Sequence, residues 1–127
     1  MARSRLFMAV IDDDASVRKA LARLLRASGY EVEAFASGTE FLESIDKGIP
    51  DCLVLDMHMP SVTGLDVQAA LLARDVHVPI IFITAYDDQG LRDRAMEQGA
   101  VAFLRKPLTE QSLLAVIETA VGSGHPA

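Results

Sequence analysis

The stretch LFMAVIDDD, residues 6–14, joins six apolar residues directly to three aspartates. A short continuous run of such apolar residues is typical of a parallel strand that is covered on both faces. Adjacent carboxylates repel one another unless a positive group or water lies among them. The stretch therefore predicts a buried strand that carries an acidic cluster at its carboxyl end.

The overall composition suits a single domain, since the chain has 127 residues and half of them are hydrophobic. The net charge of −6 and the pI of about 4.9 argue against direct binding of nucleic acid, which depends on a basic face. No apolar run approaches the ~20 residues of a membrane helix, and the N-terminal apolar run is too short for a signal peptide. We therefore expect a soluble, cytoplasmic protein.

Apolar runs alternate with segments of helical periodicity along the chain. The runs are 6–11, 31–35, 52–55, 80–84 and 101–104. The helical segments are one that follows Asp14 and is closed by Gly29, one opened by Ser37, 65–74, 90–98 and one opened by Thr109. This alternation predicts an α/β fold of the (βα)5 kind, a doubly wound, five-stranded parallel sheet with helices on both faces. We expect the domain to occupy residues 1–121 and a flexible linker or tail to begin at 122–127.

Chemically useful residues stand at the carboxyl ends of four of the predicted strands. They are Asp12, Asp13, Asp56, Thr84 and Lys106. Ligands of open α/β sheets bind beyond the carboxyl ends of the strands. Clustered carboxylates suit a hard divalent cation such as Mg²⁺, and a carboxylate can also attack phosphorus. A lysine and a hydroxyl can then bind phosphoryl oxygens, whereas Asp14 is expected to cap the helix that follows it.

These motifs resemble those of the receiver domain of two-component response regulators, most closely the FixJ/NodW type. The acidic pair Asp12-Asp13, the turn DMHMP at 56–60 with Gly64, the pair TA at 84–85 and the pair KP at 106–107 follow the family's order and spacing. The resemblance implies a flavodoxin-like strand order, 2-1-3-4-5. It also implies a phosphorelay signal receiver that accepts a phosphoryl group from a sensor histidine kinase and catalyses only its own phosphorylation and dephosphorylation.

The resemblance assigns a role to each matching position. Asp56 would be the phosphoacceptor, and Thr84 and Lys106 would bind phosphoryl oxygens. The ligands of Mg²⁺ or Mn²⁺ would be Asp12, Asp13, Asp56 and the backbone carbonyl of His58. Of these, Asp13 would contact the metal directly and Asp12 largely through water.

The resemblance also implies a conformational switch. Thr84 and Phe103 would move together and remodel the face built from the helix 90–98, the strand 101–104 and the last helix. That face would then control a partner, a homodimer, or a DNA-binding output domain that this chain does not include. His58 and Tyr86 would tune the lifetime of the phosphoryl group.

The family pattern implies two features of the backbone as well. The bond between Lys106 and Pro107 would be cis. Gly64 would adopt a backbone conformation that other residues avoid.

Two alternatives stay open from the sequence. A magnesium phosphatase of the haloacid dehalogenase type would use Asp12 as its nucleophile, because IDDDASV nearly fits the Asp-x-Asp pattern of those enzymes. That alternative leaves Asp56 and Lys106 unexplained. The other is a receiver-like interaction module that never takes phosphate.

Overall fold

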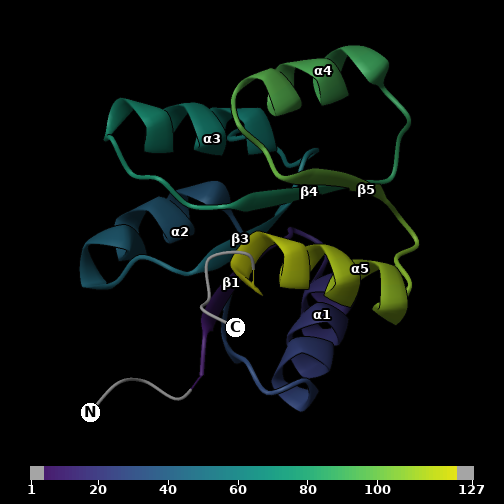
Figure 1. The fold of residues 1–127 in the computed structure, drawn as a ribbon. Coiled ribbons are helices and arrows are strands. Elements are labelled where there is room, and N and C mark those ends of the chain that lie inside the picture. The colour runs from purple at the N-terminus through teal and green to yellow at the C-terminus, as the bar shows by residue number, and fades with distance from the viewer. Residues whose placement is uncertain (1–4, 123–127) are drawn as a thin grey trace.

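The computed structural model describes residues 5–122 and shows strands alternating with helices (Figure 1). The strands are β1 (Phe7–Ile11), β2 (Glu31–Phe35), β3 (Cys52–Asp56), β4 (Ile80–Thr84) and β5 (Ala102–Arg105). The helices are α1 (Ala15–Ala27), α2 (Gly38–Ser44), α3 (Gly64–Ala73), α4 (Gln89–Glu97) and α5 (Glu110–Ile117). A 3₁₀ turn, Ile45–Lys47, follows α2, and a π-helical turn, Glu118–Gly122, follows α5. Residues 123–127 of the predicted tail lie outside the described range.

The strands form one parallel sheet in the order β2-β1-β3-β4-β5, which confirms the predicted fold and strand order. Ile11 pairs with Phe35 on one side and with Leu55 on the other, so β1 lies where the strand order reverses. Asp56 pairs with Ile83, and the carboxyl ends of β1, β3 and β4 therefore meet at one edge. This edge is where a doubly wound sheet places its ligand site.

Helices cover both faces of the sheet (Figure 1). Ala9 and Ile11 point into a core shared with α2, α3 and α4, whereas Met8 and Val10 point into a core shared with α1 and α5. Every residue of β3 and β4 is buried, as expected for strands with helices on both sides. None of the helices in the described part of the chain has the length and hydrophobicity that a membrane crossing needs.

Local capping interactions set the helix boundaries. Asp14 caps α1 as predicted, because its carboxylate accepts hydrogen bonds from the amides of Ser16 and Val17. A capping box that was not predicted opens α3, in which Thr63 and Asp66 bond to each other's main chain. This box starts α3 at 64 instead of 65. The predicted cis bond before Pro107 is confirmed.

The prediction that Gly64 adopts a backbone conformation that other residues avoid is wrong. Among the described residues, the glycines with positive φ are Gly29 and Gly99, which end helices. A β-carbon on Gly64 would instead lie 2.7 Å from the carbonyl oxygen of Asp56 and 2.9 Å from the Cα of Met57. Gly64 is therefore the residue that lets the amino end of α3 pack directly against the end of β3.

Candidate functional site

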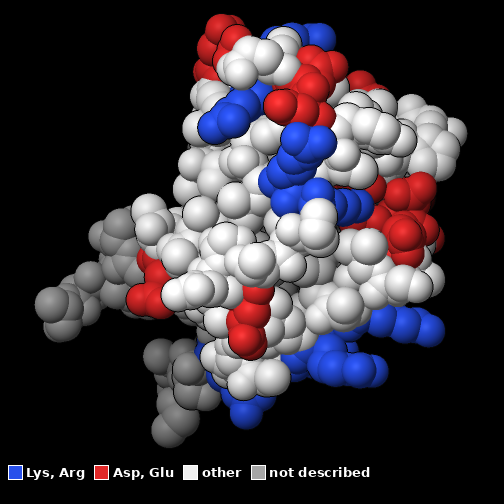
Figure 2. All heavy atoms as spheres, turned by 90° about the vertical axis from the view of Figure 1, so that its right-hand side faces the viewer, with Lys and Arg blue, Asp and Glu red and all other residues white. Residues whose placement is uncertain are grey.

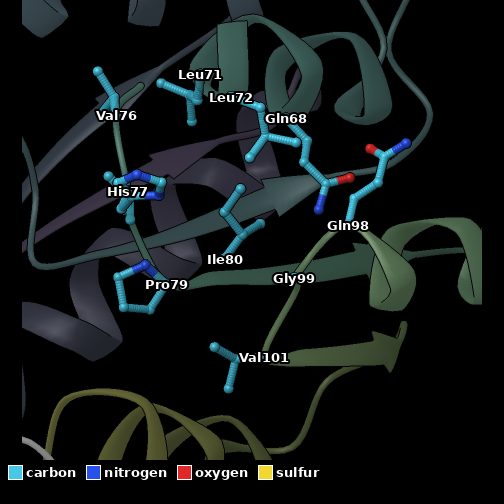
Figure 3. Close-up of a pocket in the computed structure, with 11 residues that line it drawn as sticks. Gln68, Leu71, Leu72, Val76, His77, Pro79, Ile80, Gln98, Gly99 and Val101 are labelled. Atoms are coloured by element: carbon cyan, nitrogen blue, oxygen red, sulfur yellow. The ribbon is translucent and has the colours of Figure 1, made fainter. Parts of the chain in front are cut away.

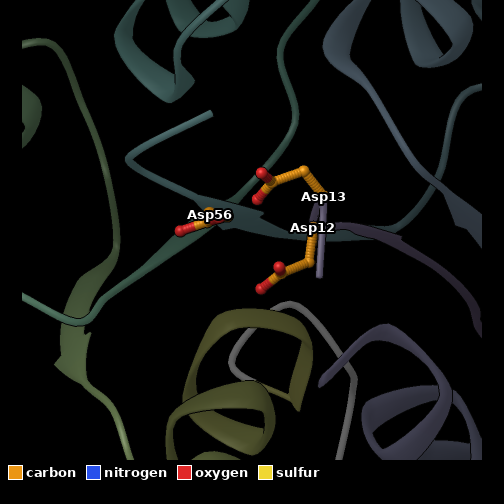
Figure 4. A group of neighbouring side chains, drawn as sticks. All are labelled: Asp12, Asp13 and Asp56. Carbon is orange, nitrogen blue, oxygen red and sulfur yellow. The ribbon is translucent and has the colours of Figure 1, made fainter. Parts of the chain in front are cut away.

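Three aspartates meet at the carboxyl edge of the sheet (Figure 4). Asp12 and Asp13 follow β1, Asp56 ends β3, and one carboxylate oxygen of each lies within 4.8 Å of the others. Asp12 is fully buried, Asp56 is 3 % exposed, and Asp13 is open to solvent. Two buried carboxylates and one accessible carboxylate fit a hard divalent cation such as Mg²⁺ or Mn²⁺, which combines carboxylate ligands with water.

Lys106 brings a positive charge to this acidic cluster. Its ammonium nitrogen lies 2.9 Å from Oδ2 of Asp12 and 3.5 Å from Oδ1 of Asp56. The loop between β5 and α5 carries Lys106 to this position, and its side chain is only 19 % exposed. One ammonium cannot balance three carboxylates, so the site remains net negative when all of them are ionised.

The excess of negative charge affects the pKa values of the groups in the cluster. Burial raises the pKa of Asp56 to about 7, and the charge of Asp12 adds to this effect more than Lys106 offsets it. Burial lowers the pKa of Lys106, but its hydrogen bond to Asp12 and the charge of Asp56 outweigh burial and raise it. Near neutral pH, Asp56 therefore holds a proton for part of the time unless further positive charge enters the site.

Main-chain groups fix the two buried carboxylates. Oδ1 of Asp12 accepts a hydrogen bond of 2.9 Å from the amide of Asp14, and Oδ1 of Asp56 accepts one of 3.4 Å from the amide of His58. Arg18 of α1 donates from Nη1 to the carbonyl of Asp12 at 2.8 Å. The Asp12 side chain and the Asp12 carbonyl are thus each held by a hydrogen bond.

Thr84 lies at the end of β4 and is 1 % exposed. Its hydroxyl oxygen accepts a hydrogen bond from the amide of Tyr86 and donates one to the carbonyl of the same residue, both at 3.1 Å. The single O–H donor of Thr84 is therefore used within its own loop, and the hydroxyl must give up its bond to the Tyr86 carbonyl before it can donate to another group.

A family model described as the response regulator receiver domain matches residues 8–118. The chain belongs to this family. Nodulation protein W of Bradyrhizobium diazoefficiens is 43 % identical over 119 residues, which cover 94 % of this chain and 52 % of that protein. Response regulator protein TmoT of Ectopseudomonas mendocina is 40 % identical over 112 residues, which cover 88 % of this chain and 51 % of that protein. The chain spans about half the length of these curated relatives.

Solved structures agree with this membership. The response regulator StyR has a TM-score of 0.87 and 44 % identity, over 94 % of this chain and 61 % of that one. A response regulator receiver protein from Burkholderia phymatum has a TM-score of 0.83 and 40 % identity, over 97 % of this chain and 100 % of that one. The predicted FixJ/NodW resemblance is confirmed, and the chain is a receiver domain of the response regulator family.

Two aromatic side chains that follow the strands of the receiver site contact each other, and this contact was not predicted from the sequence. His58 and Tyr86 are both exposed, and their rings meet edge to face with centroids 5.0 Å apart and an interplanar angle of 88°. His58 follows β3 and Tyr86 follows β4, so only the adjacency of these strands brings the rings together. His58 follows Asp56 by two residues, and Tyr86 follows Thr84 by two residues.

Phe103 lies on β5 and takes no part in the acidic cluster. It is half-buried, and its ring centroid lies 6.3 Å from that of Phe82 on β4. Figure 2 shows the side of the receiver on which the loops after β4 and β5 lie. Acidic and basic side chains lie beside one another on this side.

Proposed function

We propose that this receiver accepts a phosphoryl group from a sensor histidine kinase on Asp56, in a reaction that requires Mg²⁺ or Mn²⁺. The observation that carries the proposal is the position of Lys106, whose ammonium nitrogen lies near both a fully buried carboxylate, Asp12, and Asp56. A nucleophile, a set of metal ligands and a cation for the phosphoryl oxygens are therefore gathered in one place. Phosphoryl transfer needs little from a protein beyond such positioning and charge neutralisation.

The proposed chemistry gives every residue of the cluster a role. A carboxylate oxygen of Asp56 attacks phosphorus, the P–N bond to the kinase histidine breaks, and the imidazole keeps the electron pair and takes a proton from solvent. Asp12, Asp13, Asp56 and the backbone carbonyl of His58 would hold the divalent cation. When bound, that cation supplies positive charge to the transferring oxygens. Lys106 binds a second phosphoryl oxygen and also favours the ionised, nucleophilic form of Asp56.

The signal leaves the site through Thr84. A phosphoryl group on Asp56 adds roughly −1.5 to −2 charge and strong acceptor oxygens, which compete with the main chain of Tyr86 for the Thr84 hydroxyl. Movement of Thr84 frees space near Phe103 and remodels the face formed by α4, β5 and α5. We propose that this face then controls a homodimer or a transcriptional output domain, since the relatives include transcriptional regulatory proteins.

Phosphorylation by acetyl phosphate tests the proposal without the kinase. We expect mass spectrometry to locate one added phosphoryl group on Asp56 when Mg²⁺ is present. Chelation of the metal or the Asp56→Asn substitution should abolish the labelling, because each removes a required part of the site. Asp12→Asn should slow labelling but leave Asp56 as the modified residue.

Two other results would contradict the proposal. Labelling of Asp12, or turnover of small phosphoesters that Asp12→Asn abolishes, would instead favour a phosphatase of the haloacid dehalogenase type. A folded, Mg²⁺-saturated protein that takes no phosphate from acetyl phosphate or from a histidine kinase would favour the phosphate-independent interaction module.

The aromatic pair is expected to set the lifetime of the phosphoryl group. Tyr86→Ala removes the ring that lies against His58, and we expect hydrolysis to become roughly 3- to 10-fold faster because water reaches the site more easily. Tyr86→Phe keeps the ring contact and should retain the wild-type lifetime. The decay of phosphorylated protein after removal of acetyl phosphate measures both rates. Equal lifetimes for Tyr86→Ala and wild type would show that the pair does not shield the site.

A further inference from the structure

Helix α4 is held to the domain by little apolar packing. Ala95 is its one buried residue and Leu91 is half-buried, whereas the rest of this fully described helix is exposed. By comparison, α3 buries Val67 and Leu71, among other residues. Burial of apolar surface is the main force that holds a helix to a sheet. The position of α4 therefore depends more than that of α3 on individual polar contacts.

One such contact comes from a buried glutamine on α3. Gln68 is 1 % exposed, and its Nε2 donates a hydrogen bond of 3.1 Å to the carbonyl of Ala95. That carbonyl also accepts a bond of 3.0 Å from the amide of Ala100, while the amide of Gly99 bonds to Met96. Together with the positive φ of Gly99, these bonds close the carboxyl end of α4. Gln68 thus binds a carbonyl in the last turn of the helix.

The amino end of α4 is held differently. Residues 87–90 are all exposed, and the Asp88 carboxylate caps its own helix by accepting a bond of 3.1 Å from the amide of Leu91. The nearest ion pair, between Arg105 and Asp87, is solvent-exposed with atoms 3.8 Å apart, so it contributes little. The loop that leads into this end begins at Thr84. One end of α4 is therefore connected to the phosphoryl-binding edge, and the other end is bonded to α3.

A substitution of Gln68 can remove its hydrogen bond to α4 without lowering the stability of the domain. Its Oε1 is buried and has no hydrogen-bond partner among the described residues, and the side chain borders a cavity of about 470 Å³ between α3 and the segments around Ile80 and Gly99 (Figure 3). Methionine in place of Gln68 would remove this unsatisfied acceptor. It would leave no new one, because the Ala95 carbonyl keeps its bond to Ala100.

We propose that Gln68 is a positioning residue, which fixes the carboxyl end of α4 so that the switch moves the helix at its amino end. The Gln68–Ala95 contact is then the pivot of the movement. This inference rests on the proposed function, because the displacement of Thr84 by a phosphoryl group is what would release the amino end. The amino end of α4 then moves with the β4–α4 loop, while the carboxyl end stays bonded to α3.

Residue-resolved amide hydrogen exchange on the full chain tests the proposal, with and without acetyl phosphate and Mg²⁺. In Gln68→Met we expect the amides of Gly99 and Ala100 to exchange about 3- to 10-fold faster than in wild type, the effect of losing one hydrogen bond. The denaturation midpoint should stay equal or rise. In phosphorylated wild type, exchange should change at Leu91 and Arg92 but not at Ala100. Leu71→Met, a volume-conserving change on the same helix and cavity, should leave α4 unaffected.

Each other outcome has a defined meaning. Unchanged exchange at Gly99 and Ala100 in Gln68→Met would overturn the proposal, and so would a phosphorylated wild type in which both ends of α4 change equally. A lower denaturation midpoint with uniformly faster exchange would reduce Gln68 to a structural role and would also overturn it. If Gln68→Met loosens the carboxyl end but phosphorylation of wild type changes nothing at Leu91, the fixed end stands and the proposed switch fails.

Discussion

Gly64→Ala is expected to lower the free energy of unfolding by about 3 kcal/mol, a large share of the ~5–15 kcal/mol that stabilises a typical domain. The added methyl group would lie 2.7 Å from the Asp56 carbonyl oxygen and 2.9 Å from both the Cα of Met57 and a ring carbon of Phe82. Two of these three neighbours are backbone atoms, so the contact cannot be relieved by a side-chain rotation. Either α3 or the end of β3 has to move.

Chemical denaturation measures this loss, and Gly48→Ala is the matched control. A β-carbon on Gly48 meets nothing within 4 Å, and the change should alter stability by no more than about 0.5 kcal/mol. Because the most crowded atom is the carbonyl oxygen of Asp56, Gly64→Ala should also slow labelling by acetyl phosphate under conditions where the protein is still folded. Equal stabilities of the two variants would show that the α3–β3 contact yields easily.

Asp56→Asn is expected to stabilise the metal-free protein by about 2 to 4 kcal/mol at pH 8 while it abolishes phosphorylation. The pKa of Asp56 in the folded state is about 7, above the ordinary value of 3.8. Between these values the unfolded chain releases a proton that the folded chain retains. The contribution of Asp56 to stability is therefore complete below pH 4, falls as the pH rises, and is lost above pH 7. Asparagine carries no charge, so the variant escapes this loss.

Thermal unfolding of both proteins between pH 4 and pH 8 measures the effect. In the presence of chelator, the stability difference between Asp56→Asn and wild type should grow with pH. Added Mg²⁺ should reduce the difference at pH 8, because the cation stabilises the ionised cluster of the wild type more than that of the variant. Asp46→Asn removes an exposed negative charge from the turn after α2 and should show no such trend. A difference that is independent of pH would contradict a raised pKa at Asp56.

Much of the architecture was predictable because it depends on local patterns. Apolar runs of strand length, and helices capped by residues such as Asp14 and ended by residues such as Gly29, each reflect interactions within a few residues of the chain. Boundaries moved by one residue where long-range contacts decide them. β3 extends to Asp56 because that residue pairs with Ile83, and β5 ends at Arg105 because that residue pairs with Thr84.

The candidate site was predictable as a set of residue types but not as an arrangement. The order of the motifs indicated that Asp12, Asp56 and Lys106 belong together, since parallel strands bring their carboxyl ends to one edge. It did not indicate that the lysine lies closer to Asp12 than to Asp56. That difference depends on how the loop before α5 packs, and the roles of these residues stay predictions until phosphorylation is measured.

The sequence by itself determined which segments form strands and helices, which residues stand at the strand ends, and which family the receiver resembles. Only the tertiary structure decided that His58 contacts Tyr86, that Gly64 is required by packing rather than by its φ angle, and that Gln68 holds α4. The physical reason is the distance along the chain. Periodicity and capping are interactions among near neighbours, whereas these contacts join different elements and exist only once the strand order and register have placed them side by side.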